Sequence, residues 1–190
     1  RMIYKNAAIT SGEEEMLYQF TERLLKYEPV QYVLNEAWFC GLRFYVNNQV
    51  LIPRPETEEL VEWVISCCKF PVSELSILDI GTGSGCIPVS LKRRLRKADV
   101  RAVDISPGAL EVAAQNAEKL GTPITFQQMD ILNENNWNLL PRFDIIISNP
   151  PYVPEKDREA MEANVLDFEP ETALFVPDTD VLLFYRKIAA

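Results

Sequence analysis

The most specific chemistry in this sequence lies in four residues that follow an apolar segment, Asn149-Pro150-Pro151-Tyr152. Proline has no N–H to donate, so the proline pair ends the strand predicted at 143–148 and does not extend it. The four residues place a side-chain amide, a rigidly directed carbonyl and an aromatic ring together. We predict a binding site for a planar NH2 group, in which the Asn149 side-chain oxygen and the Pro150 carbonyl each accept one N–H. Tyr152 is expected to stack on that group.

The nitrogen of a planar amide or ring amine is a poor nucleophile, because its lone pair is delocalised. A site that holds both N–H groups and aims the nitrogen at an electrophile works by orientation and polarisation, without a strong base. The chain contains no histidine, which agrees with such a mechanism. Asn149, Pro150 and Tyr152 are therefore the predicted catalytic residues, and Pro151 joins them in binding the substrate. The structural alternative is a strand end followed by a buried tyrosine.

A second candidate for chemistry is the glycine-rich turn in DIGTGSGCI, residues 79–87. It is not a phosphate-binding P-loop, because no Lys-Ser/Thr follows at the required spacing. It is also a poor dinucleotide fingerprint, because Cys86 and Pro88 flank the place of the third glycine. An acid followed by three alternating glycines suits a nucleoside ligand without phosphates, and a simple turn is the alternative. The predicted cofactor-binding residues of this turn are Gly81, Thr82, Gly83, Ser84 and Gly85.

Two acids stand at the ends of the next two predicted strands. Asp104 can accept hydrogen bonds from both ribose hydroxyls, and Asp130 can accept one from an adenine amino group. Acids around a cationic, phosphate-free adenosyl ligand indicate S-adenosyl-L-methionine (SAM) as the cofactor. Asn149 is expected to contact the same cofactor.

The elements that must position these loops form a repeated strand–loop–helix pattern. Strands alternating with helices predict an α/β fold with a doubly wound parallel sheet, Rossmann-like, with helices on both faces. In such sheets ligands bind beyond the carboxyl ends of the strands, which is where all four loops fall. The predicted strands are 75–80, 100–105, 124–130 and 143–148, and the predicted helices are 86–96 and 107–120, the latter with Ser106 as N-cap and Gly121 after its end.

The N-terminal third is organised differently. Apolar residues at helical spacing predict an amphipathic helix over 13–27. Alternating, aromatic-rich residues over 36–52 predict a β-hairpin with Asn47-Asn48-Gln49 as its turn. A further helix is expected to begin with Thr57 as its N-cap.

Composition excludes several classes of function. The net charge is −9, and the basic run KRRLRK at 92–97 is typical of a helix end, so we expect no direct nucleic-acid partner. Without histidine, no metal site of the usual His-containing kind can form, and the four cysteines are expected to be reduced structural thiols. No apolar run reaches the roughly 18 residues of a membrane span, and no signal peptide is recognisable. We therefore expect a cytoplasmic monomer without membrane contact.

The combined motifs resemble a known family. GTGSG with Asp104 and NPPY resembles the class I SAM-dependent methyltransferases that modify planar nitrogens, and LIPRPETEELVE at 51–62 closely resembles the HemK/PrmC family. That resemblance implies transfer of a methyl group to the side-chain amide nitrogen of the glutamine in the Gly-Gly-Gln motif of peptide chain release factors. It also implies that Ile131 lies against the adenine, and that Arg54, Pro55 and Thr57 close one side of the cofactor pocket.

The resemblance implies three parts of the chain. Residues 1–35 are expected to be the remnant of an N-terminal helical domain that docks the substrate, 36–55 a hairpin linker, and 56–190 a methyltransferase domain that is incomplete at its C-terminus, since the class I fold has seven strands. Two enzymes remain as alternatives: an adenine-N6 DNA methyltransferase, which shares the tetrapeptide but which the acidity disfavours, and a ribosomal-protein glutamine methyltransferase. The third alternative is a catalytically inert fragment that binds an adenosyl ligand.

Overall fold

Four parallel strands form the central sheet of the structure, a computed structural model that describes residues 9–68 and 75–190. Each strand lies within the predicted stretch or differs from it by one residue at either end. The order across the sheet is β5-β4-β3-β6, and all neighbours are parallel, so the prediction of a parallel α/β sheet is confirmed. The strands are β3 (Ser76–Ile80), β4 (Asp99–Asp104), β5 (Thr125–Gln128) and β6 (Ile145–Ser148).

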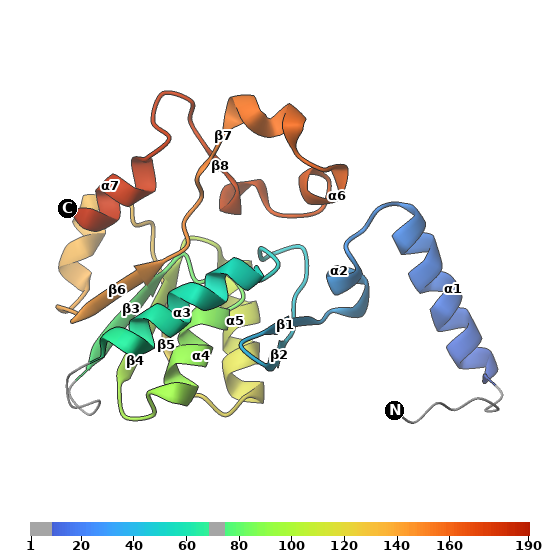
Figure 1. Cartoon of the computed structure of the whole chain (residues 1–190), viewed down its shortest axis with the longest axis horizontal. Helices are drawn as coiled ribbons and strands as arrows, with labels where there is room; N and C mark the ends of the chain where they lie inside the picture. Colours follow the sequence, from blue (N-terminus) through green and yellow to red (C-terminus); the bar gives the residue numbers. More distant parts are fainter. Residues whose placement is uncertain (1–8, 69–74) are drawn as a thin grey trace.

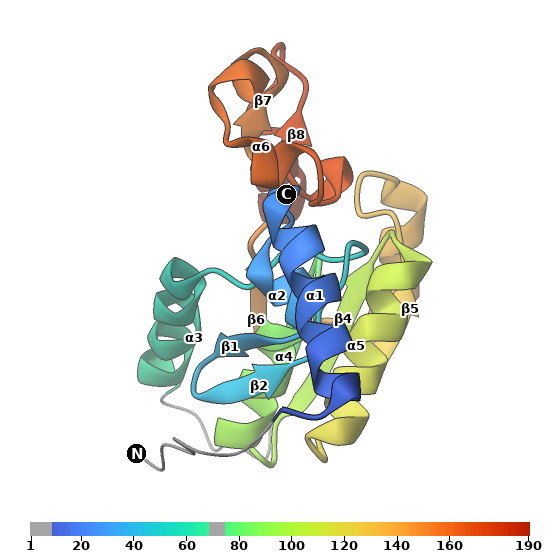
Figure 2. The same ribbon diagram turned by 90° about the vertical axis from the view of Figure 1, so that its right-hand side faces the viewer.

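Both faces of the sheet are covered, because side chains on a strand alternate between them. Ile77 of β3 joins the larger core, on the face packed by α3 (Pro55–Cys67), α4 (Cys86–Arg94) and α5 (Pro107–Lys119). Figure 2 looks onto this face, with the three helices in front of the sheet.

The opposite face carries a smaller cluster built on Leu78. Partly buried apolar residues of the turn after η2 (Glu134–Leu139) and of α7 (Leu183–Ala189) pack against it. The prediction of helices on both faces of the sheet is thereby confirmed. On this face the cover consists of two short helices, η2 and α7.

Helix α5 begins and ends as its sequence predicts. The Ser106 hydroxyl accepts a hydrogen bond from the Ala109 N–H at 3.2 Å, and Pro107 occupies the first helical position, where its missing N–H costs nothing. Gly121, with φ of 63°, ends the helix in the left-handed conformation that glycine adopts without strain.

The expected N-cap of α3 was wrong. Arg54 is the N-cap and Pro55 the first helical residue, so the helix begins three residues earlier than predicted. Proline has its φ already fixed at a helical value, and it therefore starts the helix in preference to the threonine that follows. Thr57 lies in the first turn and its hydroxyl contacts another segment, as described below.

The expected hairpin exists, but its turn was placed wrongly. Strands β1 (Ala37–Phe39) and β2 (Leu42–Phe44) pair antiparallel around Cys40-Gly41, whose φ values are 47° and 70°. Two successive positive φ values are what a tight two-residue hairpin needs, and glycine supplies one of them. The Asn47-Asn48-Gln49 segment forms a separate turn after β2, in which the Asn47 side chain accepts from the Gln49 N–H.

Helix α1 (Ser11–Leu25) stands away from the sheet (Figure 1). Thr10 and Glu13 form a reciprocal capping box at its start. The predicted amphipathic helix is present, but none of its residues is buried, and Leu17 and Leu25 are exposed. Residues 1–8 of the predicted N-terminal segment lie outside the described residues. Within those described, no helix combines the length and apolarity needed to cross a bilayer.

Side chains at the end of α1 tie it to α2 (Val30–Leu34). The Arg23 guanidinium binds the Glu28 carboxylate and donates to the backbone carbonyls of Tyr32 and Val33. The two helices are therefore held together at that end, while the apolar side of α1 stays uncovered.

After β6 the chain forms a layer over the carboxyl ends of the strands (Figure 1). Strands β7 (Val153–Pro154) and β8 (Phe175–Val176) pair in parallel, and the Val153 N–H donates to the Leu174 carbonyl at 3.0 Å. Between them lie η3 (Glu155–Ala160), α6 (Ala163–Leu166) and η4 (Glu171–Ala173). We call residues 153–176 the cover segment.

Candidate active site

A cavity of about 340 Å³ opens at the carboxyl ends of the four strands. The structure brings together in its lining almost all the residues that the sequence analysis selected. Gly85, Tyr152 and Pro55 are not among the lining residues. The predicted residues that do line it are Gly81, Thr82, Gly83, Ser84, Asp104, Asp130, Ile131, Asn149, Pro150 and Pro151, together with Arg54 and Thr57.

The glycine-rich loop is held against strand β4. The N–H groups of Gly81 and Thr82 both donate to the Val103 carbonyl, at 2.9 and 3.1 Å, and the Gly83 N–H donates to the Asp104 carboxylate at 2.8 Å. Gly81 and Gly83 have φ of 72° and 53°, a region that glycine enters freely. The loop is therefore preformed, and its backbone lies open to the cavity.

Gly85 has a packing role. Its φ is 77°, and a Cβ built on it would lie 3.0 Å from the Ala113 Cβ and 3.1 Å from the Ala113 Cα on helix α5. The missing side chain allows α4 to begin close to α5, so this glycine shapes the loop without itself lining the cavity.

Replacing Gly85 with alanine is expected to lower the free energy of unfolding by roughly 2 kcal/mol or more, because a left-handed residue gains a Cβ that also meets backbone atoms. Urea unfolding followed by circular dichroism measures this. Gly12→Ala is the matched control: it lies in exposed α1 with nothing within 4 Å, and the change should stay within about 1 kcal/mol and be stabilising. Equal effects at the two sites would contradict this packing role.

Asp104 is nearly buried at the end of β4. Its oxygens accept from the Gly83 N–H and from the Ser106 N–H, the latter at 2.9 Å. Burial raises the pKa of Asp104, and the backbone donors of Ser106 and Gly83 oppose that rise. A carboxylate has about four lone-pair directions, so acceptor capacity remains for two hydroxyls of a ligand.

The third strand end supplies a polar and an apolar neighbour. Asp130 is half-buried, and its Oδ1 accepts from the Leu132 N–H at 2.9 Å. Ile131 packs against the buried cluster that contains Met129, which also lines the cavity. This part of the wall is therefore apolar with one carboxylate at its edge.

Asn149 comes from the end of β6 and lies beside the first turn of α3. Its Nδ2 donates to the Thr57 hydroxyl at 3.2 Å. Among residues 9–68 and 75–190 this is the hydrogen bond that the Asn149 side chain makes, so its Oδ1 is left to accept from a ligand. Pro150 is buried and Pro151 half-buried, and both line the cavity.

Tyr152 lies outside the cavity lining, with 56% of its surface exposed. Strand β7 begins at the next residue, and side chains of an extended chain alternate in direction, so Tyr152 and Pro151 face different sides. Stacking of this ring on a substrate stays a prediction.

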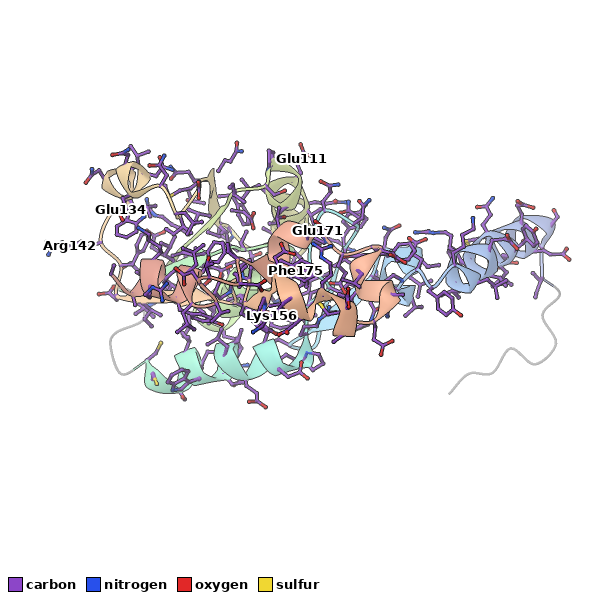
Figure 3. All side chains as sticks on the ribbon, turned by 90° about the horizontal axis from the view of Figure 1, so that it is seen from above. Glu111, Glu134, Arg142, Lys156, Glu171 and Phe175 are labelled. Carbon is purple, nitrogen blue, oxygen red and sulfur yellow. The ribbon has the colours of Figure 1, made fainter. Side chains whose placement is uncertain are left out.

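Several lining residues were missed because they come from segments without a recognisable motif. These residues lie in the segment before α3, in the cover segment and in α7. Figure 3 shows Phe175 and Glu171 on the cover segment, over the middle of the molecule. The missed residues are Gln49, Val50, Leu51, Ile52, Pro53, Pro170, Thr172, Ala173, Phe175 and Phe184.

Glu169 links two of these segments. Its side chain is almost fully buried, its Oε2 accepts from the Ile52 N–H at 3.1 Å, and its Oε1 binds the Arg54 guanidinium at 2.6 Å. In the sequence, the one indication of this role is that an acid stands between Phe168 and Pro170. If that acid is buried, it needs a charged partner.

Asp79, the acid that precedes the glycines, is fully buried beneath the loop. Burial raises the pKa of Asp79 to about 7, and the charge of Asp104 adds to the rise. The Thr82 hydroxyl opposes part of it, although its geometry falls short of a hydrogen bond: among the described residues neither Asp79 oxygen has a partner. The folded protein therefore holds a proton that the unfolded chain loses near pH 4.

This shift predicts that the free energy of unfolding falls as pH rises from about 4 to 7, because the folded state binds more protons in that window. Asp79→Asn removes the dependence and should be more stable than the parent at pH 8, by on the order of 2 kcal/mol, with a smaller gain at pH 5. Calorimetry without cofactor measures both. Exposed Asp99→Asn serves as control, and a gain for Asp79→Asn that is the same at both pH values would contradict the assignment.

Comparison with known proteins adds three findings. A family profile described as "Methyltransferase domain" matches residues 77–168. A "Release factor glutamine methyltransferase" of Flavobacterium psychrophilum is 50% identical over 92% of this chain and 60% of its own length. The protein of the same name from Bacteroides thetaiotaomicron is 48% identical over 97% of this chain and 65% of its own length.

A solved structure supports the fold alone. The catalytic domain of hMettl16, in complex with the MAT2A 3′UTR hairpin 6, aligns with a TM-score of 0.57 and 20% identity, covering 78% of this chain and 55% of that one. The chain thus has a class I methyltransferase fold, and it spans 60 to 65% of the length of the two curated relatives. Over 92 to 97% of its residues, this chain is thus similar to two proteins named release factor glutamine methyltransferase.

Proposed function

We propose that the protein transfers a methyl group from SAM to the side-chain amide nitrogen of the glutamine in the Gly-Gly-Gln motif of a peptide chain release factor. The observation that carries the proposal is the position of Asn149 and Pro150 in the same cavity as the glycine-rich loop and Asp104. A group that accepts amide hydrogens thereby stands next to a nucleoside-type site.

The residues present fit the cofactor. The open backbone of residues 81–84 suits the methionine part, Asp104 retains acceptor capacity for the ribose hydroxyls, and Asp130 with Ile131 suits the adenine. Among the described lining residues the charged groups are Asp104, Asp130 and Arg54, and Arg54 is paired with Glu169, so cationic charge is low where the sulfonium would lie. When bound, SAM supplies an electrophilic methyl group on a positively charged sulfur.

The protein's own groups hold and orient the acceptor. Asn149 Oδ1 accepts one amide N–H and the Pro150 carbonyl accepts the other, so the nitrogen lone pair faces the methyl group. Bound SAM would supply the methyl group with loss of its S–C bond, and the acceptors of Asn149 and Pro150 would hold the amide nitrogen while it gains the methyl group and gives one proton to solvent. Orientation and desolvation are the main contributions, with Asn149, Pro150 and Tyr152 as the catalytic residues.

Methylation of this glutamine implies a release factor as the partner. A release factor presents its glutamine on a protein surface, and we assign its docking to the helical segment 1–35, whose helix α1 exposes Leu17 and Leu25. Residues 36–55 are the linker and 56–190 the methyltransferase part. The proposal places the protein in the cytoplasm, as a monomer, with neither nucleic acid nor membrane as a direct partner. The net charge of −9 supports a protein substrate over DNA.

The test is methyl transfer from labelled SAM to a purified release factor, with the full-length protein as enzyme. Label should appear on the release factor and not on the variant whose Gly-Gly-Gln glutamine is replaced by alanine. A DNA duplex and a ribosomal protein preparation are tested in parallel. Label on either of these, with none on the release factor, would overturn the proposal.

A further inference from the structure

The first turn of helix α3 makes one contact that no motif assigned: the Thr57 hydroxyl accepts from Asn149 Nδ2 at 3.2 Å, across 92 residues of sequence. Thr57 is nearly buried and lines the cavity beside Asn149. It is neither a helix cap nor, by position, a residue of the glycine-rich or Asn-Pro-Pro-Tyr loops. Its hydroxyl contacts the amide nitrogen of the residue whose oxygen is the proposed acceptor of the substrate amide.

We propose that Thr57 is a positioning residue that holds the Asn149 side-chain amide in place beside the target nitrogen; this rests on the proposed function. An asparagine amide has two nearly isosteric orientations, which exchange Oδ1 and Nδ2. With Nδ2 bound to Thr57, Oδ1 faces the target nitrogen and can accept its N–H. In the other orientation the Thr57 hydroxyl could donate to Oδ1, but Nδ2 would then face the N–H of the target amide. The target N–H therefore selects the orientation, and Thr57 anchors the side chain in it.

The turn that carries Thr57 is itself fixed at two further points. Arg54 binds buried Glu169 of the cover segment at 2.6 Å, and the Glu58 carboxylate accepts from the Cys40 N–H of the hairpin at 2.8 Å. Three side chains of this turn thus contact three different segments of the chain. Such cross-linking holds the hydroxyl in place, which a positioning role requires.

The experiment compares two substitutions that separate shape from hydrogen bonding. Thr57→Val keeps the branched shape and loses the hydroxyl, whereas Thr57→Ser keeps the hydroxyl. We expect Thr57→Val to lower kcat for the release factor by roughly tenfold or more, with the Kd for SAM changed by less than about threefold. Thr57→Ser should retain most of the parent kcat. Thermal unfolding confirms that both variants fold.

A double-mutant cycle tests whether the effect passes through Asn149. In the Asn149→Ala background, Thr57→Val should cause no further loss of kcat, because there is no amide left to hold. The proposal would be overturned if Thr57→Val lowered kcat equally in both backgrounds, or if Thr57→Ser lowered kcat as much as Thr57→Val does. A parent-like kcat in Thr57→Val would also overturn it.

A spectroscopic readout separates this proposal from the proposed function. In a ¹⁵N-labelled sample the Asn149 side-chain NH2 signals, assigned by their loss in Asn149→Ala, should shift in Thr57→Val and stay near their parent positions in Thr57→Ser. This outcome is expected even if the release factor is not the substrate. If the signals are unmoved in Thr57→Val, the contact does not hold the amide in place.

Discussion

Replacing Asn149 with alanine is expected to lower kcat for methyl transfer by roughly a hundredfold to a thousandfold. The substitution removes the acceptor proposed for the target nitrogen in the cavity, and preorganised groups of this kind contribute most of their effect in the transition state. The backbone carbonyl of Pro150 remains, so some orientation is retained. Steady-state kinetics with a release factor, and calorimetric titration with SAM, measure the two quantities separately.

The structure offers a matched control for this substitution. Asn135 is exposed on η2 and does not line the cavity, so Asn135→Ala should leave kcat within about twofold of the parent. SAM affinity should fall by less than about tenfold in Asn149→Ala. A variant that binds SAM normally and still turns over at the parent rate would show that another group holds the amide.

The second large effect is expected at Asp104. Replacing it with alanine should weaken SAM binding by roughly tenfold to a hundredfold, because the ribose loses its acceptor and the Gly83 N–H loses the carboxylate that holds the loop. The loss should appear mainly in the Kd and KM for SAM, with a smaller change in kcat at saturating cofactor.

The same strand supplies the comparison. Asp99 lies at the amino end of β4, exposed and paired with Arg101, far along the strand from the cavity. Asp99→Ala should leave the Kd for SAM within about twofold. If Asp104→Ala binds SAM as tightly as Asp99→Ala does, the ribose is held by other groups and the cofactor placement is wrong.

The sheet could be predicted because its information is local. Strands β3 and β6 contain apolar runs, SILDI and IIIS, and each of the four strands is followed by a loop residue with distinctive chemistry. The edge at which parallel strands end is fixed by topology. The start of α5 was equally readable, because Ser106 and Pro107 act within one helical turn.

The hairpin turn and the N-cap of α3 were predicted wrongly, because at each place two nearby sequence patterns suggested the same kind of structure. Asn47-Asn48-Gln49 resembles a turn and is one, but Cys40-Gly41 makes the tighter connection, and a non-glycine residue with positive φ leaves no clear trace in sequence. At α3, both Pro55 and Thr57 suit the start of a helix, and the helix begins at Pro55, which precedes Thr57 in the chain.

The remaining part of the site depends on contacts between distant segments. Glu169 meets Ile52 and Arg54 more than a hundred residues away, and Asn149 meets Thr57. No spacing rule connects such positions, since their meeting depends on how the cover segment and α3 pack over the sheet. The residues with chemistry could therefore be selected from the sequence, and Arg54 and Thr57 were named through the family resemblance, whereas the contacts that these two residues make could not be predicted.

The most direct test of the central claim is to locate the transferred group. The full-length protein is incubated with a release factor and SAM carrying a trideuterated methyl group, and the product is digested and sequenced by tandem mass spectrometry. We expect one added CD3 on the side-chain nitrogen of the Gly-Gly-Gln glutamine, formed roughly a hundredfold or more slowly when the enzyme carries Asn149→Ala. A label on any other residue, or on that glutamine with Asn149→Ala at the parent rate, would contradict it.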